Sequence, residues 1–439
     1  MSNAQHTLAL LGGTPVRQVP LPPYNTIGEE EKTAVMNVLD SGELSGFIAD
    51  PGKSFWGGKY VLALEDCFRE HFNIKHAVAV NSATSALHCA IAASGIGPGD
   101  EVIVTPYSLS ASASVIFMTG AVPVFADIDE KTFCLDPASV EAAITPYTKA
   151  IMTVNLFGHP SPLLRLREIA DRHDLILIED NAQSPDALCH GRHAGTIGDM
   201  GIFSFNRHKT IQCGEGGILI TNSENLHLKS ALVRNHGEFV IEKMGVKDIV
   251  NMVGLNLRMT EMEAAVALCQ FRKLPSLNAQ RNEMADRLTQ GLSGLDGITP
   301  PFTDPDCTHV YYFYVMKYDA KITGIPRNLF TKALNAEGVS IRSGFLQPIY
   351  FEPLYQKKIC FGPNGYPFTS NPRNESLSYA KGICPVTERI EDEELMLTNM
   401  LYPPLTLQDM DSFVNACEKV LNNRDALINW SYKQMQSST

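Results

Sequence analysis

Several features that define large protein classes are missing from this sequence of 439 residues. Its ten cysteines include no CxxC pair, which argues against a disulfide framework or a metal site and predicts reduced thiols in a cytoplasmic protein. No apolar run is long enough to span a membrane, and the N-terminus has neither the basic start nor the apolar core of a signal peptide. A formal net charge of -12 argues against nucleic acid and anionic membranes as partners.

What the sequence does contain is an ordinary globular composition, with 44% hydrophobic and 19% charged residues. The chain is longer than one hydrophobic core ordinarily supports, which predicts two domains. Through the first 257 residues, short apolar runs alternate with helical patterns such as 161–174. This alternation predicts an α/β domain whose mostly parallel, seven-stranded sheet is covered on both faces. The expected strands are 76–81, 101–106, 121–128, 150–158, 175–180, 201–205 and 216–221.

The pattern changes after about residue 257. The stretch that follows has helical spacing, which predicts helices that connect two domains. Apolar stretches at 309–318 and 339–345 predict strands of a smaller α+β domain, 409–421 predicts a helix that closes it, and 346–386 is expected to be rich in loops. The expected division is an N-terminal arm at 1–24, a large domain at 25–257, connecting helices at 258–295 and a small C-terminal domain at 296–439.

Polar residues stand at several strand ends, where sheets of this type bind their ligands. Segment 81–87 (NSATSAL) lies at a strand-to-helix junction. Its Ser82, Thr84 and Ser85 offer hydroxyls, and the new helix offers free N–H groups. These groups suit a phosphate, although a simple helix N-cap explains the same residues. Asp180, in IEDNAQ, either faces a ligand or caps the next element.

Lys209 belongs to the segment FSFNRHKTIQCGEGG (203–217). Ser204 ends a strand in the same segment, and the glycines after the lysine permit either a close approach of backbone to ligand or a hairpin turn. Asn256 is a polar residue within the apolar run 254–258. Each signal is weak alone, but together they supply phosphate donors, a carboxylate and one lysine at a single edge of the sheet.

Pyridoxal 5'-phosphate requires such a set of groups. Its aldehyde needs a lysine amine to form a Schiff base, and its pyridine nitrogen needs an acid so that the protonated ring can draw electrons from the substrate Cα. Its phosphate needs hydroxyl and N–H donors. A nicotinamide site would show a GxGxxG turn after a strand, and neither that motif in such a position nor a P-loop is present. The pattern therefore favours Lys209 as a covalent catalyst over a solvated surface lysine.

With these motifs in order, the chain resembles the DegT/DnrJ/EryC1/StrS family of sugar aminotransferases, within the aspartate aminotransferase-like fold type I of pyridoxal phosphate enzymes. The resemblance extends from LLGGTPVR near the N-terminus to CPVTER (384–389) and the C-terminal helix. It implies that 25–257 is the cofactor-binding domain. Its most specific segments are GDEVIVTPY (99–107), VNLFGHP (154–160), IEDNAQ (178–183), GTIGDMGIFSF (195–205), GEGGILIT (214–221), VRNHG (233–237) and GLNLRMTEMEAA (254–265).

The resemblance implies a role for each matching residue. Lys209 matches the Schiff-base lysine and general acid/base, Asp180 the carboxylate that pairs with the ring nitrogen, and Gln183 the contact to the ring hydroxyl. Asn256 matches an asparagine that reaches the cofactor phosphate of the neighbouring subunit, which implies a homodimer with shared active sites. The other implied cofactor-binding positions are Ala83, Thr84, Ser85, Leu109 and Ser204.

One departure from the family concerns the pocket. Leu109, in TPYSLSAS, stands where the family commonly has an aromatic residue stacked on the cofactor ring, and residues 206–208 also differ from the commoner sequence before the lysine. The implied reaction moves an amino group from glutamate or glutamine to a keto-sugar, usually nucleotide-linked, or to a keto-cyclitol. Two alternatives are a sugar dehydratase of the same family, which would replace Lys209 with histidine, and a non-catalytic regulatory relative, which would be expected to lose Lys209 or Asp180.

Overall fold

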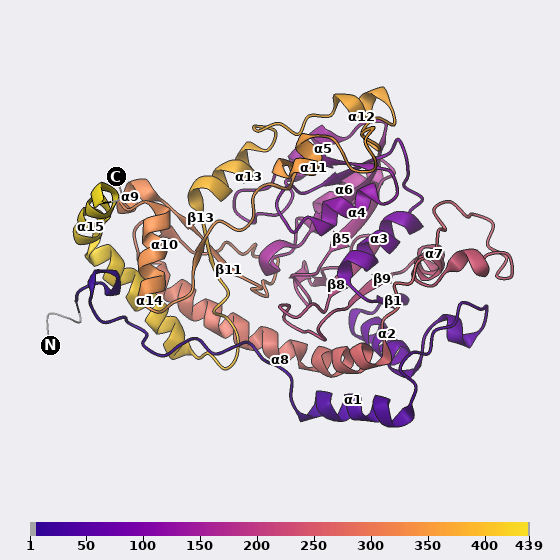
Figure 1. Cartoon of the computed structure of the whole chain (residues 1–439), viewed down its shortest axis with the longest axis horizontal. Coiled ribbons are helices and arrows are strands. Elements are labelled where there is room, and N and C mark those ends of the chain that lie inside the picture. The colour runs from indigo at the N-terminus through magenta and orange to yellow at the C-terminus, as the bar shows by residue number, and fades with distance from the viewer. Residues whose placement is uncertain (1–5, 438–439) are drawn as a thin grey trace.

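A seven-stranded sheet forms the centre of the computed structural model, which describes residues 6–437 (Figure 1). Its strands are β1 (His76–Val80), β2 (Glu101–Val104), β3 (Val122–Phe125), β4 (Thr148–Val154), β5 (Ile176–Asp180), β8 (Met200–Ser204) and β9 (Gly217–Thr221). They lie in the order β1-β9-β8-β5-β4-β2-β3. Only β9 runs antiparallel to its neighbours, and the other pairs are parallel. The predicted mostly parallel sheet is confirmed.

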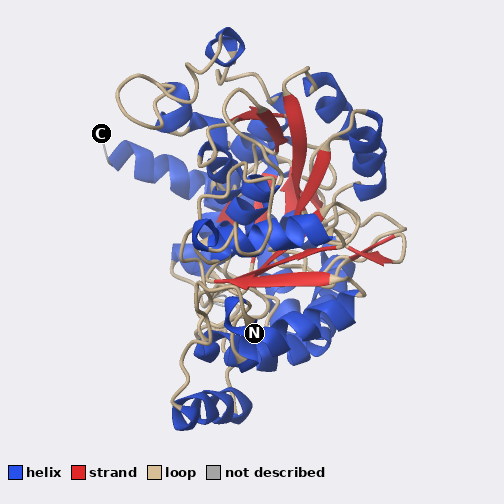
Figure 2. Cartoon of the chain, turned by 90° about the vertical axis from the view of Figure 1, so that its right-hand side faces the viewer, coloured by secondary structure: helices blue, strands red, loops and turns tan. Residues whose placement is uncertain are grey.

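Helices cover both faces of this sheet (Figure 2). They are α2 (Lys59–Phe72), α3 (Ala83–Ala93), α4 (Ala111–Phe117), α5 (Pro137–Ala143), α6 (Leu163–Arg172) and α7 (Glu224–Arg234). Because successive side chains of a strand point to opposite faces, Val102 and Val104 of β2 pack with α3, α4 and α7, whereas Ile103 packs with α5 and α6. The face that includes α3 and α4 is the one that matters for the candidate site.

A single helix, α8 (Glu261–Leu292), joins the two halves of the chain over 32 residues. A capping box fixes its start, since Thr260 Oγ1 accepts a hydrogen bond from the Glu263 N–H (3.3 Å) and the Glu263 carboxylate accepts one from the Thr260 N–H (3.0 Å). The helix contacts α1 (Glu29–Ser41) and α2, and also α14 (Leu407–Asn422) of the second half. Figure 1 shows it extending along one side of the molecule from α2 to the small sheet.

The second half of the chain contains a four-stranded antiparallel sheet in the order β10-β11-β13-β12. Its elements are β10 (Ile298–Thr299), β11 (Tyr314–Tyr318), α9 (Ala320–Thr323), α10 (Arg327–Ala336), β12 (Arg342–Ser343), β13 (Leu395–Thr398) and α15 (Arg424–Ser437). Leu8 from the N-terminal arm is buried in this core, and Arg17 Nε lies 3.2 Å from Asp409 Oδ1 of α14. This part is the expected smaller α+β unit, although the domain boundaries stay a prediction.

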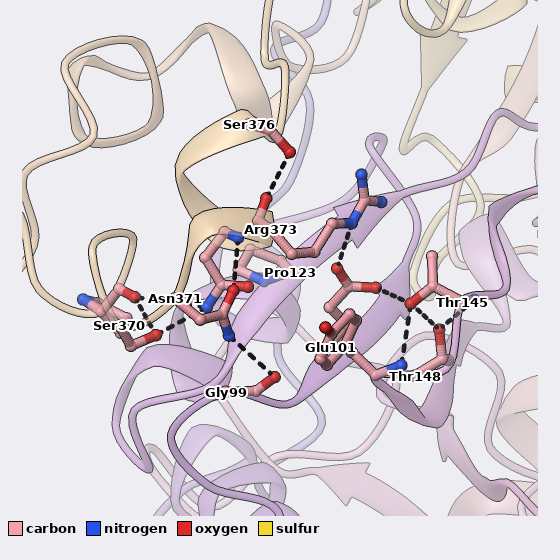
Figure 3. Close-up of polar contacts among 12 residues, drawn as sticks. Gly99, Glu101, Pro123, Thr145, Thr148, Ser370, Asn371, Arg373 and Ser376 are labelled. Carbon is pink, nitrogen blue, oxygen red and sulfur yellow. Dashed lines mark hydrogen bonds and ion pairs between the residues drawn. The ribbon is translucent and has the colours of Figure 1, made fainter.

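The loop-rich segment before β13 folds back onto the large sheet. It contains α11 (Pro353–Gln356), α12 (Pro372–Ser376) and α13 (Pro385–Arg389). Tyr355, Phe368 and Tyr379 join the hydrophobic core around α3 and α4. Arg373 Nε lies 2.9 Å from Oε1 of Glu101, a fully buried carboxylate at the start of β2 (Figure 3). Part of the range 296–439 therefore packs with the large domain.

Two short strands lie outside both sheets and form a hairpin after β5. These strands are β6 (Leu188–Cys189) and β7 (Arg192–His193), which pair antiparallel. Across residues 6–437, the helices are all too short or too polar to cross a membrane.

Candidate active site

A cavity of about 130 Å³ lies at the carboxyl ends of β5 and β8, beside the N-terminus of α3. Seven of the predicted site residues line it, which agrees with the expectation that ligands bind at this edge of the sheet. These seven are Ala83, Thr84, Leu109, Asp180, Gln183, Ser204 and Lys209. Ser85 and Asn256 do not line it.

Lys209 reaches the cavity from the loop between β8 and β9. Its backbone N–H donates to the Asn206 carbonyl at 2.8 Å, and a bridge between Asn206 and Gly214 closes the base of the loop. The side chain is half-buried, and its Nζ lies 4.6 Å from the centre of the Tyr312 ring. Burial lowers the pKa of the Lys209 ammonium to about 8, although the Asp180 carboxylate opposes this shift. Near neutral pH, a fraction of the protein molecules therefore carries Lys209 as the uncharged amine.

Asp180 is the last residue of β5 and is only 6% exposed. Its carboxylate accepts hydrogen bonds from the Ser112 hydroxyl (2.7 Å) and the Ala182 N–H (3.1 Å). Burial raises the pKa of the Asp180 carboxyl, while these two donors and the charge of Lys209 oppose the rise. The cavity thus holds an acid whose protonation depends on what lies beside it.

Glu179, the other acid at this strand end, points to the opposite face. Its carboxylate accepts hydrogen bonds from the backbone N–H groups of Gly195 (2.6 Å), Ile197 (2.8 Å) and Gly198 (2.6 Å). It therefore secures the turn before β8 and does not line the cavity.

The sequence left two interpretations of segment 81–87 open, a helix N-cap and a phosphate site, and the N-terminus of α3 has features of both. Ser82 is the N-cap, and its Oγ accepts from the Ser85 N–H at 3.1 Å. The Ser85 hydroxyl donates to Asn81 Oδ1 at 2.6 Å, so it is already used within the loop. Among the described residues, the N–H groups of Ala83 and Thr84 have no hydrogen-bond acceptor. Two helix N-terminal donors and the exposed Thr84 hydroxyl are therefore available to an anion.

A glycine on the neighbouring strand permits this arrangement. A Cβ atom at Gly217, the first residue of β9, would lie 2.4 Å from the Ala83 nitrogen. A side chain there would push strand and helix apart, so Gly217 is required for the close approach.

The remaining predicted residues differ in how they meet the cavity. Gln183 is buried, and its Oε1 accepts from the Phe157 N–H at 2.9 Å, which fixes the amide against the wall. Ser204 Oγ accepts from the Asn206 N–H at 3.3 Å. Leu109 stands at the rim and is 58% exposed. Their roles toward a cofactor stay predictions.

Asn256 lies apart from the other predicted residues. Its side chain is exposed, and within residues 6–437 its Oδ1 accepts only from the nearby Arg258 N–H at 3.4 Å. A bridge with Asn235 holds its backbone in place. Asn256 therefore does not serve the Lys209 cavity of its own chain in this structure.

The sequence did not identify Ser112, whose hydroxyl donates to Asp180, as a site residue. It also did not identify the residues that line a second, larger cavity of about 530 Å³. His208 lines both cavities, so the two adjoin. Lining residues of the second cavity come from the N-terminal arm, the Lys209 loop, α8 and the small domain, and such distant segments leave no local sequence signal. They include Tyr24, Arg207, Gln212, Arg281, Tyr312, Phe313, Asn399 and Tyr402.

In the described part of the chain, one group of three side chains has the residue types and the close spacing of metal ligands. Asp186 Oδ1 lies 2.7 Å from His71 Nε2 and 3.1 Å from His193 Nδ1. Ligand atoms around a tetrahedral zinc ion stand about 3.3 Å apart. The shorter contact is that of a hydrogen bond, so this group is explained as a polar link between α2 and the hairpin.

Taken together, the doubly covered sheet, the smaller α+β unit and a cavity that joins a lysine, a carboxylate and a helix N-terminus define a fold type I aminotransferase. The model of the DegT/DnrJ/EryC1/StrS aminotransferase family matches residues 25–417, and the chain belongs to this family. The family and fold predicted from the sequence are confirmed.

Two known relatives match this chain over nearly its whole length. The chain is 35% identical over 96% of its length to a putative L-glutamine:3-amino-2,3-dideoxy-scyllo-inosose aminotransferase from Streptoalloteichus tenebrarius, covering 99% of that protein. It is 33% identical over 92% of its length to the spore coat polysaccharide biosynthesis protein SpsC from Bacillus subtilis, covering 98% of it.

Solved structures show the same similarity in three dimensions. The DesI structure, determined in the presence of its TDP-sugar product, aligns with a TM-score of 0.80 at 26% identity, covering 98% of this chain and 100% of that one. An aminotransferase from Psychrobacter cryohalolentis aligns with a TM-score of 0.79 at 29% identity, covering 92% and 99%. The chain is thus an aminotransferase of this family.

Proposed function

We propose that the Lys209 cavity holds pyridoxal 5'-phosphate and that this chain transfers the amino group of glutamine or glutamate to a polyhydroxylated six-membered ketone, either a keto-cyclitol or a nucleotide-linked keto-sugar. The observation that supports this most directly is that Lys209 and Asp180 line one cavity. The rival dehydratase would need histidine at position 209, and the rival non-catalytic protein would not need both residues.

The donor groups around the cavity fit the cofactor. The free N–H groups of Ala83 and Thr84 and the Thr84 hydroxyl match a phosphate at the start of α3. Asp180, which lines the same cavity, would pair with the ring nitrogen, and Ser112 would keep its carboxylate oriented. When bound, the cofactor supplies the electron sink that makes the substrate Cα–H bond acidic.

Lys209 would be the covalent anchor and the base that moves the proton. Because the pKa of Lys209 is lowered to about 8, a fraction of the protein molecules carries it as the free amine near neutral pH. The free amine can take a proton from one carbon and return it to another. Asp180, as a carboxylate, stabilises positive charge that develops beside it. Asp180 is held at the end of the buried strand β5, and Lys209 is held by the bridged loop between β8 and β9, which limits their movement.

The larger cavity would receive the amino donor and the acceptor. It adjoins the Lys209 cavity at His208, and Tyr312 lines it within 4.6 Å of the Lys209 amine. Its other polar lining residues, such as Arg281, Asn399 and Gln212, offer the hydrogen-bond donors that a carboxylate or a ring with several hydroxyls requires. Relatives named for glutamine and scyllo-inosose derivatives support a cyclitol among the candidates.

We further propose a homodimer in which Asn256 completes the phosphate site of the second subunit. Asn256 is exposed and lies outside its own cavity. Large apolar side chains that a second copy would bury are exposed near it in the sequence, namely Ile249, Val250, Val253 and Leu255. A dimer explains this exposure, because water-exposed apolar side chains gathered in one segment commonly mark an interface.

The test combines a donor half-reaction with an acceptor panel. The cofactor-loaded enzyme is mixed with glutamine or glutamate alone, and conversion of the cofactor is followed by absorbance. A keto-cyclitol, a nucleotide-linked keto-sugar and a free keto-sugar are then supplied, and the amino product is detected by mass. We expect conversion with at least one donor and amination of one ring class, with neither in Lys209→Ala. A wild-type enzyme that converts no cofactor with either donor would contradict the proposal.

A further inference from the structure

Two cysteines from distant parts of the chain meet beside the β6–β7 hairpin. Cys189 ends β6, and Cys307 belongs to the segment that leads to β11. The two residues form an isolated antiparallel bridge, although 118 positions separate them in the sequence. Both pack into one small apolar cluster with Leu163 and Val310. Cys189 is buried, whereas Cys307 is partly exposed.

The backbone hydrogen bonds define the register of this pair. The His190 N–H donates to the Asp306 carbonyl (2.7 Å), and the Thr308 N–H donates to the Leu188 carbonyl (2.8 Å). Both bonds therefore connect the residues that flank the cysteines, not the cysteines themselves. This arrangement is the non-hydrogen-bonded position of an antiparallel ladder, in which the Cα atoms stand about 4.5 Å apart and the side chains are closest. Disulfides need Cα atoms about 4.4–6.8 Å apart, so the backbone already satisfies their geometry.

The Cys307 thiol lowers the pKa of the Cys189 thiol, against the opposing effect of burial and with help from His190. A thiolate is the nucleophile in disulfide formation. The pair therefore has one sulfur that is readily ionised and one that a small oxidant can reach.

We propose that Cys189 and Cys307 are an oxidisable pair that forms a reversible intrachain disulfide when the enzyme meets a peroxide. The Cys189 thiolate first attacks hydrogen peroxide, which gives a Cys189 sulfenic acid and, with one proton, one water. The Cys307 thiol then attacks the Cys189 sulfur and gives up its proton, the S–S bond forms, and the hydroxyl group leaves with that proton as a second water. Two thiols are oxidised and one peroxide is reduced. A thiol reductant reverses the change.

The bond would restrain one wall of the active site. The segment that contains Cys307 continues to Tyr312, whose ring lies 4.6 Å from the Lys209 amine. Backbone bonds from Val310 N–H to Gly158 (2.9 Å) and from Phe313 N–H to Phe157 (3.2 Å) already attach this segment to the large domain. A disulfide would add a covalent link at its start and close a long loop, which stabilises a folded chain mainly by restricting the unfolded one.

Mass spectrometry of the full-length, cofactor-loaded enzyme tests the proposal. The reduced protein is treated with hydrogen peroxide, remaining thiols are alkylated, and a non-reducing digest is analysed. We expect one linked peptide that joins Cys189 to Cys307, two of the ten thiols lost, and no crosslink between chains. The oxidised protein should unfold about 5 °C higher than the reduced one, and dithiothreitol should reverse both changes.

Variants separate this pair from general oxidation. Cys189→Ser and Cys307→Ser should each abolish the linked peptide and the thermal shift, whereas Cys360→Ser, at another partly exposed cysteine, should keep both. If oxidised wild-type protein carries alkylated Cys189 together with free, sulfinic or differently paired Cys307, the proposal is wrong. This measurement on the unaltered sequence does not depend on the folding of any variant or on catalytic activity.

Discussion

Replacing Asp180 with Asn changes the charge of the candidate site while it keeps the shape of the side chain. Asp180 accepts hydrogen bonds from Ser112 Oγ at 2.7 Å and from the Ala182 N–H at 3.1 Å, and the amide oxygen of Asn can retain one of them. A neutral amide cannot hold the cofactor nitrogen in its protonated form. We therefore expect turnover to fall by at least about 10²-fold, about 3 kcal/mol of transition-state stabilisation.

The same change should not weaken the cofactor-free fold. Burial raises the pKa of the Asp180 carboxyl above its ordinary value, and Ser112, Ala182 and Lys209 only oppose this rise. Because the folded chain then binds the proton more tightly than the unfolded chain, stability falls as pH increases through the interval between the two pKa values and stays lower above it. Asn has no proton to lose, so the Tm of the cofactor-free variant near pH 7 should equal or exceed that of the wild type.

Two measurements decide the outcome, namely kcat at saturating cofactor and the thermal unfolding of the cofactor-free protein. Glu179→Gln is the matched control, since its carboxylate binds the N–H groups of Gly195, Ile197 and Gly198 outside the cavity. That variant should have a lower Tm and nearly unchanged turnover per folded enzyme. Near-wild-type turnover of Asp180→Asn, or a selective loss of turnover in Glu179→Gln, would refute the assignment.

Three further predictions concern the lysine, the second subunit and the fold. Lys209→Ala should abolish turnover but still bind the cofactor, and borohydride should no longer attach the cofactor to residue 209. In the wild type, borohydride attachment of the cofactor to another lysine would contradict the assignment. Mixed Lys209→Ala and Asn256→Ala subunits should regain activity at about one quarter of their sites, and no recovery after verified exchange means that Asn256 acts in its own subunit. Arg373→Ala should lower the free energy of unfolding by about 1–3 kcal/mol, less than for a fully buried pair because Arg373 is 37% exposed beside buried Glu101. Arg165→Ala, in an exposed pair, should cost at most about 1 kcal/mol in denaturant titrations, and equal losses contradict the reasoning.

Much of the large domain could be predicted because its strands are short, apolar and separated by helical patterns. The stretch 309–318 was harder, and its first half is not a strand. Tyr311 has a φ of 45°, and β11 begins only at Tyr314. Aromatic composition indicated a strand, but these residues pack against the Phe157–Gly158 turn and place Tyr312 at the active site. Tertiary contacts overrode local propensity there.

The same limit explains which site residues the sequence could identify. Lys209, Asp180 and the start of α3 stand next to recognisable strand ends, so position in the pattern was enough. Tyr312 and Arg281 reach the larger cavity from the small domain and from α8. Their approach depends on how the two halves of the chain pack, and neither spacing nor composition specifies this.

The period of a strand nevertheless contains more information about the site than composition does. Ile178 and Ile202 pack on the sheet face that α3 and α4 cover. Asp180 and Ser204 follow them by two positions, so they point to that same face and meet at the N-terminus of α3. Glu179, one position away, must point to the other face, as its contacts with the turn before β8 show. Two acids of similar chemistry therefore take different roles because one residue of register separates them.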